Sequence, residues 1–349
     1  MGMRIENGGI LTTVQDGGRF GYEQFGVSPS GPMDMRAMNI ANILVGNHIN
    51  ESCLEMTIMG PQIRFTGNAV IALTGADMKP AINGRTVSMY RAVAVQSGDV
   101  LKLGTAQSGC RAYLAAAGGL DIPELMGSKC TMVGNGFGGY RGRKLQKDDE
   151  IGFVKNVSVL PNMQARWALP DRYQAREHVL RVIMGPQDDM FTEKGINSFL
   201  GGAYKVGQEF DRMGYRLEGP VIEHKEDGNI ISDGVVTGSV QVPTAGRPIV
   251  MLAEHQTIGG YTKIATVITV DLPVIGQCRA GDAIRFRAVT VDEAQKLYEA
   301  YYQEMEALQK RMETPSAYLP PRNFTVTIGE KVYQVQVRKE RSKKCIRWI

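Results

Sequence analysis

Two six-residue segments, GDVLKL at residues 98–103 and GDAIRF at residues 281–286, repeat one pattern in the two halves of the chain. In each, a Gly-Asp pair that is typical of a turn leads into a short apolar run that is typical of a β-strand. A looser copy, DDEIGF, occupies residues 148–153. The repeat predicts two similar, β-rich lobes in a chain whose 349 residues are enough for two domains.

Short apolar runs bounded by Gly, Asn and Asp recur through the rest of the chain. They lie at residues 69–73, 92–95, 100–103, 111–115, 235–242, 249–252, 264–270 and 283–286. Glycine supplies 41 residues, about 12% against a usual share of about 7%, which indicates many turns. We therefore predict a mainly β fold with few helices, in which residues 1–158 and 174–290 form the lobes and residues 159–173, with Pro161 and Pro170, form the crossing segment.

Helix signals are found in two places. One helix is expected after SGPMD at residues 30–34, with Pro32 in its first turn and Gly46 as its end. The second begins at Thr290, where TVDE forms a capping box, and covers residues 291–313 with an apolar stripe suited to packing. Beyond it, the alternation at residues 324–328 and 332–337 predicts a hairpin within a basic tail, residues 314–349.

Charge and cysteine content exclude several classes of protein. The net charge is +4, but the residues from Arg322 onward carry eight basic and two acidic side chains, so the body lacks the basic face of a nucleic-acid-binding protein. The five scattered cysteines form no C-x-x-C pair, which favours free thiols in a reducing compartment. There is no signal-peptide core and no apolar run near 18 residues, so we expect a cytoplasmic protein without a membrane partner.

The usual catalytic motifs are weak or missing. The four histidines show no metal-binding spacing, so no metal site is predicted. GNGFGG at residues 134–139 matches G-x-G-x-x-G, but no apolar helix follows it, which argues against a dinucleotide or nucleotide phosphate loop. It is either a surface loop or a loop whose N–H groups meet an anion. GSKC at residues 127–130 holds a Ser and a Cys without a nucleophile elbow.

Polar residues are instead concentrated in glycine-bounded segments at residues 12–22, 26–34, 211–220 and 254–263. Each places Arg or Lys, a carboxylate and a hydroxyl or amide within a few residues of glycine. We interpret them as turns, where functional residues are common, and a guanidinium suits carboxylate or carbamate groups. The alternative is that they are salt-bridged turns that hold the fold together.

These segments occur together with five others: LTGAD at 73–77, AYLAAAGGLD at 112–121, GFGGYRGRKL at 136–145, SVQVP at 239–243 and GQCRAGDAIRF at 276–286. In this order, over residues 5–290, they resemble the allophanate-hydrolase-subunit-2-like family. Its members include the C subunit of bacterial 5-oxoprolinase, the carboxyltransferase domain of urea carboxylase, and an antagonist of a sporulation-kinase inhibitor. Two positions depart from the family pattern: Glu254 stands where Asp is usual, and Thr262 where Pro is usual.

The resemblance implies two cyclophilin-like β-barrel lobes and a subunit of a 5-oxoprolinase-type, ATP-dependent amidohydrolase complex that acts on a small cyclic amide. The complex would bind ATP and include a subunit-1-like protein (the B subunit) and a subunit-A amidohydrolase; this chain would be inactive alone. One alternative is a carboxyltransferase subunit for a urea-like substrate, with biotin on a separate carrier. The other is a non-catalytic antagonist of a kinase inhibitor. The tail hairpin also resembles the opening hairpin of a biotin carrier domain, without its biotinylation turn.

Candidate site residues follow from the polar segments and the resemblance. The catalytic candidates are Asp16, Asp34, Tyr261 and Lys263. Substrate-binding candidates are Arg19, Ser30, Arg212, Arg216, Gln256, Thr257, Gly259 and Gly260. Glu254 is a further candidate, for proton transfer or for holding the cations in place. Since neither half supplies a full set of acid, base and cation, we expect the two groups to converge on one cleft between the lobes.

Overall fold

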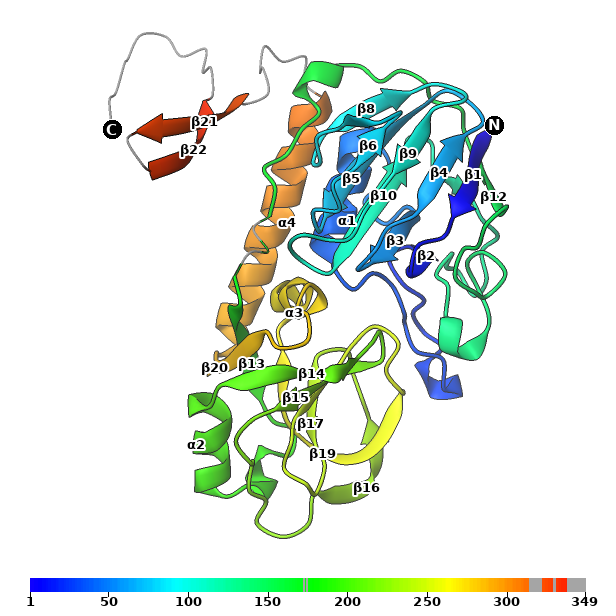
Figure 1. The fold of residues 1–349 in the computed structure, drawn as a ribbon. Coiled ribbons are helices and arrows are strands. Elements are labelled where there is room, and N and C mark those ends of the chain that lie inside the picture. The colour runs from blue at the N-terminus through cyan, green and yellow to red at the C-terminus, as the bar shows by residue number, and fades with distance from the viewer. Residues whose placement is uncertain (172, 174, 314–321, 329–330, 338–349) are drawn as a thin grey trace.

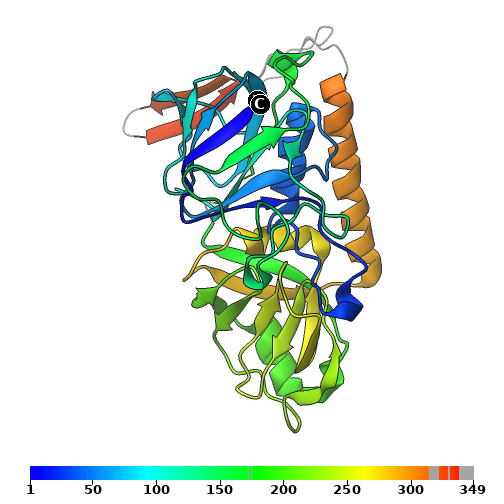
Figure 2. The same ribbon diagram turned by 90° about the vertical axis from the view of Figure 1, so that its right-hand side faces the viewer.

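The computed structural model describes residues 1–171, 173, 175–313, 322–328 and 331–337. Two β-rich lobes are stacked along the long axis of the molecule, and one long helix lies beside the N-terminal lobe (Figures 1 and 2). The expected mainly β fold with few helices is confirmed. None of the helices in these ranges is long and apolar enough to cross a membrane.

The N-terminal lobe is made of two sheets. The seven-stranded sheet has the order β11 (Leu120–Asp121), β12 (Glu150–Phe153), β1 (Gly2–Asn7), β4 (Gln62–Phe65), β9 (Val100–Lys102), β6 (Ala81–Ile82) and β7 (Arg85–Thr86). The five-stranded sheet has the order β2 (Leu11–Gln15), β3 (Cys53–Thr57), β10 (Arg111–Ala116), β5 (Ala69–Gly75) and β8 (Ala92–Val95). Apolar side chains from both sheets form one buried core.

The C-terminal lobe is a closed barrel of seven strands. Its order is β13 (Glu177–Met184), β20 (Ala283–Ala288), β14 (Tyr204–Phe210), β15 (Gly214–Glu218), β18 (Ile249–Met251), β17 (Ser239–Val242) and β19 (Ile258–Val267), which pairs with β13 again. Strand β16 (Asn229–Gly234) is added outside the ring on β19. Helix α2 (Glu193–Gly201) covers β20, where the Phe199 and Phe286 rings stack 4.4 Å apart.

The repeated turn that the sequence predicts is present three times. In each copy the Asp Oδ2 accepts a hydrogen bond of 2.7–2.8 Å from the N–H three residues earlier, in the pairs Gln96–Asp99, Gln146–Asp149 and Arg279–Asp282. The residue before each Asp has a positive φ. Its N–H donates to the carbonyl of a residue in a neighbouring strand, and the N–H of that same residue donates to the carbonyl of the Asp. The echo between the two halves is therefore a real structural repeat.

Helix α1 (Met35–Val45) begins later than a first turn at Pro32 would require. Asp34 is its N-cap, because the Asp34 Oδ1 accepts a hydrogen bond of 2.8 Å from the Ala37 N–H. Pro32 therefore precedes the helix, which corrects that detail of the prediction. The helix ends as expected at Gly46, whose φ of 76° is left-handed.

Helix α4 (Val291–Glu313) starts with the predicted capping box. The Thr290 Oγ1 accepts from the Glu293 N–H at 3.2 Å, and the Glu293 Oε2 accepts from the Thr290 N–H at 2.8 Å. Its apolar stripe packs against α1, with Met305 and Met312 buried, so the predicted packing face is confirmed. Although α4 follows the C-terminal barrel in the sequence, it lies along the N-terminal lobe and links the two (Figure 1).

Some segments differ from the expectation. Only residues 239–242 of the run at 235–242 are strand, and the supposed turn at residues 258–263 is the first part of β19. Helices α2 and α3 (Leu272–Gly276) are not evident in the sequence, and α3 lies between the lobes (Figure 1). The tail hairpin is confirmed as β21 (Arg322–Ile328) paired with β22 (Lys331–Val337). Residues 314–321 and the basic end at 338–349 lie outside the described residues.

Candidate functional site between the lobes

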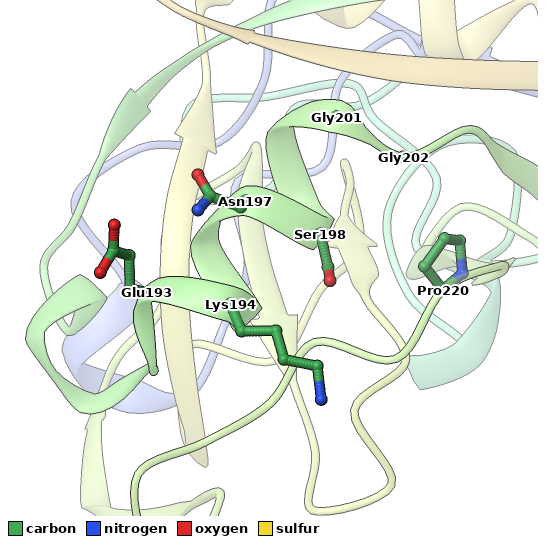
Figure 3. A pocket seen from close by; sticks show the side chains of 7 residues that line it. All are labelled: Glu193, Lys194, Asn197, Ser198, Gly201, Gly202 and Pro220. Atoms are coloured by element: carbon green, nitrogen blue, oxygen red, sulfur yellow. The ribbon is translucent and has the colours of Figure 1, made fainter.

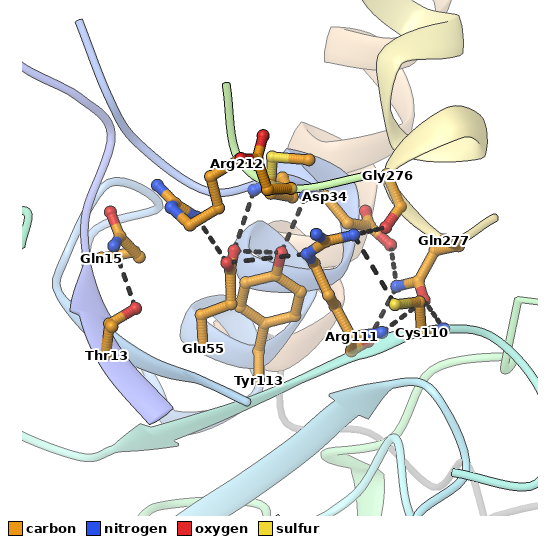
Figure 4. A network of polar contacts seen from close by, with 12 residues as sticks. Thr13, Gln15, Asp34, Glu55, Cys110, Arg111, Tyr113, Arg212, Gly276 and Gln277 are labelled. Atoms are coloured by element: carbon orange, nitrogen blue, oxygen red, sulfur yellow. Dashed lines mark hydrogen bonds and ion pairs between the residues drawn. The ribbon is translucent and has the colours of Figure 1, made fainter. Parts of the chain in front are cut away.

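A buried polar network joins the two lobes, and Arg212 of the C-terminal lobe is its hub (Figure 4). The Arg212 guanidinium donates to the Glu55 Oε1 at 2.5 Å and to the Glu254 Oε1 at 2.6 Å. It also donates to the Gly31 carbonyl at 2.6 Å and to the Ser30 Oγ at 3.3 Å. Arg212 and Glu55 are 5% and 1% exposed, so their charges depend on each other rather than on water.

Glu55 lies on β3 and fixes the loop before α1. Its Oε2 accepts hydrogen bonds from the Met33 N–H at 2.8 Å and from the Tyr113 hydroxyl at 2.7 Å. Arg111, also buried, places its Nε 3.9 Å from the Glu55 Oε1 and donates to the Tyr215 hydroxyl of the other lobe at 2.6 Å. Two arginines and two glutamates thus balance their charges at the interface.

Asp34 is connected to the same network through Gln277, which follows α3. The Gln277 Nε2 donates to the Asp34 Oδ2 at 2.7 Å, and its Oε1 accepts from the backbone N–H groups of Cys110 and Arg111. Burial, together with the nearby Asp171 carboxylate, raises the pKa of Asp34 to about 6. Asp34 could therefore exchange a proton near neutral pH, but all its oxygens already cap α1 or bind Gln277 and Tyr173.

Asp16 and Arg19, two other N-terminal candidates, contact the segment at residues 125–130. Asp16 accepts from the Ser128 hydroxyl, the Lys129 N–H and the Cys130 thiol at 2.6–2.8 Å. Arg19 is fully buried and donates to the Leu125 and Cys130 carbonyls. Burial raises the pKa of the Cys130 thiol to about 12, so it stays protonated and is unsuited to act as a nucleophile. Although the Arg19 Nη1 has no hydrogen-bond partner, it is buried and no described cavity reaches it.

The structure brings only part of the two groups together. Ser30 and Arg212 meet at the interface, with Glu254 beside them, as expected. Lys263 is buried elsewhere in the barrel wall, where its Nζ donates to the Asp233 Oδ2 at 2.9 Å. Thr257, Gly259 and Gly260 lie at or within the start of β19, and Thr257 is buried. Arg216, Gln256 and Tyr261 line a cavity in the C-terminal lobe.

This cavity has a volume of about 480 Å³. Its polar lining includes Glu209, Asp211, Arg216, Gln241, Gln256 and Tyr261, and Met213 and apolar side chains of β14 and β18 complete it. It adjoins the interlobe network through residues 211–213, since Arg212 points between the lobes while its two neighbours line the cavity. Concave sites with an apolar lining and a few polar groups are typical of small-molecule binding.

Two other features carry less chemistry. A larger, open depression of about 680 Å³ lies on α2, and none of the candidate residues lines it (Figure 3). Among the described residues, one group could hold a metal ion, namely His178, Cys278 and Asp282, whose donor atoms lie within 4.8 Å of one another. Both Asp282 oxygens are already occupied, by Arg176 and by the Arg279 N–H, so the group does not fit a metal as it stands.

In the loop at residues 134–142, Gly138 and Gly139 serve packing, whereas Gly134 and Gly136 have open space around them. A Cβ on Gly138 would lie 2.2 Å from the Cys130 carbonyl oxygen, and one on Gly139 would lie 1.8 Å from the Thr131 Oγ1. These glycines are thus needed for the close approach of the chain to itself. The loop is followed by turns and β12 rather than by a helix, so it does not fit a nucleotide phosphate.

Several residues of the network are absent from the sequence-based candidates, namely Glu55, Arg111, Tyr113 and Gln277. A signal was available for two of them. Glu55 interrupts the apolar run CLEM, and Arg111 opens RAYLAAA. A charge inside a buried strand must be paired, so each predicts a partner. The identity of the partner depends on the tertiary fold and could not be predicted.

Comparison with known proteins places this two-lobed chain in a carboxyltransferase-like class. The family model described as "Carboxyltransferase domain, subdomain A and B" matches residues 25–288, and the chain belongs to this family. It is 35% identical to the C subunit of 5-oxoprolinase from Escherichia coli over 310 residues, which cover 89% of this chain and 98% of that protein. It is also 31% identical to urea amidolyase of Lachancea kluyveri, covering 87% of this chain but 18% of that protein.

Solved structures agree with this assignment. The Kluyveromyces lactis urea carboxylase superposes with a TM-score of 0.82 at 28% identity, over 97% of this chain and 32% of that one. The K. lactis urea amidolyase gives a TM-score of 0.81 at 30% identity, over 88% of this chain and 20% of that one. The chain therefore spans only a fifth to a third of these longer proteins, but nearly the whole length of the E. coli relative.

Proposed function

We propose that this chain is the carboxyltransferase-like subunit of a 5-oxoprolinase-type amidohydrolase complex, which opens a small cyclic amide at the expense of ATP. The observation that carries the proposal is the match to the 5-oxoprolinase C subunit over 98% of that protein, whereas the urea amidolyase match covers 18% of a longer chain. The polar interface and the adjoining cavity support a role in binding and orienting a small substrate.

The site residues also support a requirement for partners. Several of the charged candidates already have partners within the chain: Arg212 is paired with Glu55 and Glu254, Lys263 with Asp233, and Asp16 accepts from groups of residues 128–130. The described residues hold no phosphate loop that fits a nucleotide. Under this proposal, ATP binding and the remaining catalytic groups come from a subunit-1-like protein (the B subunit) and a subunit-A amidohydrolase.

The proposal is tested by reconstitution. The purified chain is expected to neither hydrolyse ATP nor open 5-oxoproline. Both activities are expected when it is mixed with the subunit-1-like and subunit-A-like proteins, and neither should appear when this chain is left out of the mixture. Turnover by the single chain, or full activity without it, would contradict the proposal.

The structural match to urea carboxylase favours one second candidate, a carboxyltransferase subunit that receives carboxybiotin from a separate carrier. It predicts activity with a biotinylated carrier domain and a urea-like acceptor in place of 5-oxoproline. The same reconstitution, with carrier and urea as the added components, distinguishes the two candidates.

A further inference from the structure

One buried amide in the C-terminal lobe has an unused donor. Gln241 on β17 is 1% exposed and lines the 480 Å³ cavity, yet its Nε2 has no hydrogen-bond partner. Its Oε1, in contrast, accepts from the Gln256 Nε2 at 3.3 Å. Buried side-chain donors are nearly always satisfied in folded proteins, so an unsatisfied one beside a cavity indicates a missing partner.

The main chain of Gly259 packs closely against the same amide. Gly259 on β19 lies so close to Gln241 that a Cβ on it would be 2.5 Å from the Gln241 Nε2. Any larger residue at position 259 would therefore cover the free N–H. Gln256, which is exposed, bonds the other end of the amide through one long contact, so its movement can open Gln241 to the cavity.

The charged groups that line the cavity are partly paired with one another. Arg216 is paired with Glu209 at 2.8 Å, so its positive charge is already compensated. Asp211 uses its Oδ1 to accept from the Met213 and Gly214 N–H groups, while its Oδ2 makes no hydrogen bond with the described residues. Among the polar groups of the cavity are thus a buried donor, the Gln241 amide, and an acceptor, the Asp211 Oδ2, and an amide can use both.

We propose that this cavity is the site for a small amide, whose carbonyl oxygen accepts from the Gln241 Nε2–H and whose N–H donates to Asp211. The identity of the ligand as a cyclic amide rests on the proposed function, whereas the site itself rests on the orphan donor and the cavity. Gln241 is not among the residues that the sequence indicates, because its role depends on what packs around it.

The test is Gln241→Met in the full chain, with pyrrolidinone, 5-oxoproline and urea as probes in ligand-observed NMR. Met has a similar volume without a polar group, so the variant is expected to melt at the same or a higher temperature than the wild type. Binding of pyrrolidinone is expected to weaken by roughly tenfold or more, since the donor to its carbonyl is lost.

A matched control is Gln15→Met. Gln15 is equally buried, but its Nε2 donates to the Thr13 Oγ1 at 3.0 Å and to the Thr131 carbonyl at 3.1 Å (Figure 4 shows the first contact). This variant is expected to melt at a lower temperature and to keep pyrrolidinone binding. Opposite changes in melting temperature for the two variants would support a ligand role for Gln241 rather than a structural one.

Two results would overturn the site. The first is a melting temperature of Gln241→Met that is lowered as in the control. The second is that every probe binds the variant as it binds the wild type, or that no probe binds the wild type. If the wild type binds urea through Gln241 but neither cyclic amide, the site stands and the 5-oxoprolinase proposal fails. If the reconstituted complex opens 5-oxoproline with an unchanged KM in Gln241→Met, the function stands and the site falls.

Discussion

Replacing Glu55 with Gln is expected to uncouple the two lobes. The substitution keeps the shape of the side chain but removes the charge that compensates the buried Arg212 guanidinium. Each amide orientation also faces a donor: Oε1 meets the Arg212 Nη1 at 2.5 Å, and Oε2 meets the Met33 N–H and the Tyr113 hydroxyl at 2.7–2.8 Å. An amide nitrogen at either place would leave at least one buried donor without an acceptor.

The size of the effect follows from burial. Breaking a buried ion pair by removing one partner typically costs about 3–5 kcal/mol, and hydrogen bonds to charged groups contribute about 1.5–3 kcal/mol each. We therefore expect the free energy of unfolding in urea to fall by about 3–5 kcal/mol. Because the lost contacts join the lobes, a single unfolding transition is expected to separate into two when fluorescence and circular dichroism are compared.

Glu209→Gln is the control, since Glu209 pairs with Arg216 at 2.8 Å while 79% of its side chain is exposed. Exposed pairs contribute about 0–1 kcal/mol, so this variant should unfold almost like the wild type. A loss below about 1 kcal/mol for Glu55→Gln, or a loss equal to that of the control, would refute the view that this carboxylate holds the interface.

Three further predictions follow from single contacts. Burial raises the pKa of Asp34 from 3.8 to about 6, so the folded chain binds this proton more tightly than the unfolded chain, and stability falls as pH rises from about 4 to about 6. In Asp34→Asn this part of the fall should be absent when the free energy of unfolding in urea is measured at pH 4 and pH 7. The same change in free energy between the two pH values in the variant and in the wild type would contradict the prediction. Gly138→Ala should lower the free energy of unfolding by about 2 kcal/mol or more, because its Cβ would lie 2.2 Å from a carbonyl oxygen at a φ of 68°. Gly134→Ala, with open space around it, should lower it by no more than about 0.5 kcal/mol in the same denaturant titration. Thr290→Ala removes the N-cap of α4 and should lower the free energy of unfolding by about 1 kcal/mol, and an unchanged thermal melt would show that the capping box is not needed.

Local signals in the sequence predicted local structure well. The N-terminal cap of α4, the end of α1 at Gly46 and the Gly-Asp turns are set by residues within three or four positions of one another. The segment at residues 258–263 misled because paired glycines usually mark a turn, yet here Gly259 is extended and gives room to the Gln241 side chain. That requirement arises from another strand and leaves no mark near position 259.

In the candidate site, too, the sequence indicated single residues but not their long-range partners. Arg212 and Ser30 could be picked from polar, glycine-bounded segments, and the structure brings them together. Glu55 and Arg111 could at most be recognised as charges in need of partners, because each is 100 residues or more from the residue in the other lobe that it contacts. Long-range pairing of this kind is decided by how the lobes dock, which depends on both cores at once.

The interface and the cavity are connected through three consecutive residues, 211–213. Arg212 is held between the lobes by Glu55, Glu254 and the Gly31 carbonyl, while Asp211 and Met213 on either side of it line the cavity. The backbone is fixed at the same place, since the Arg212 carbonyl accepts from the Glu254 N–H at 2.8 Å. A change at Glu55 is therefore expected to shift Asp211 and Met213 in the wall of the cavity, although Glu55 does not line it. The interlobe ion pairs thus stabilise the fold and, through residues 211–213, position the acceptor that the proposed amide ligand requires.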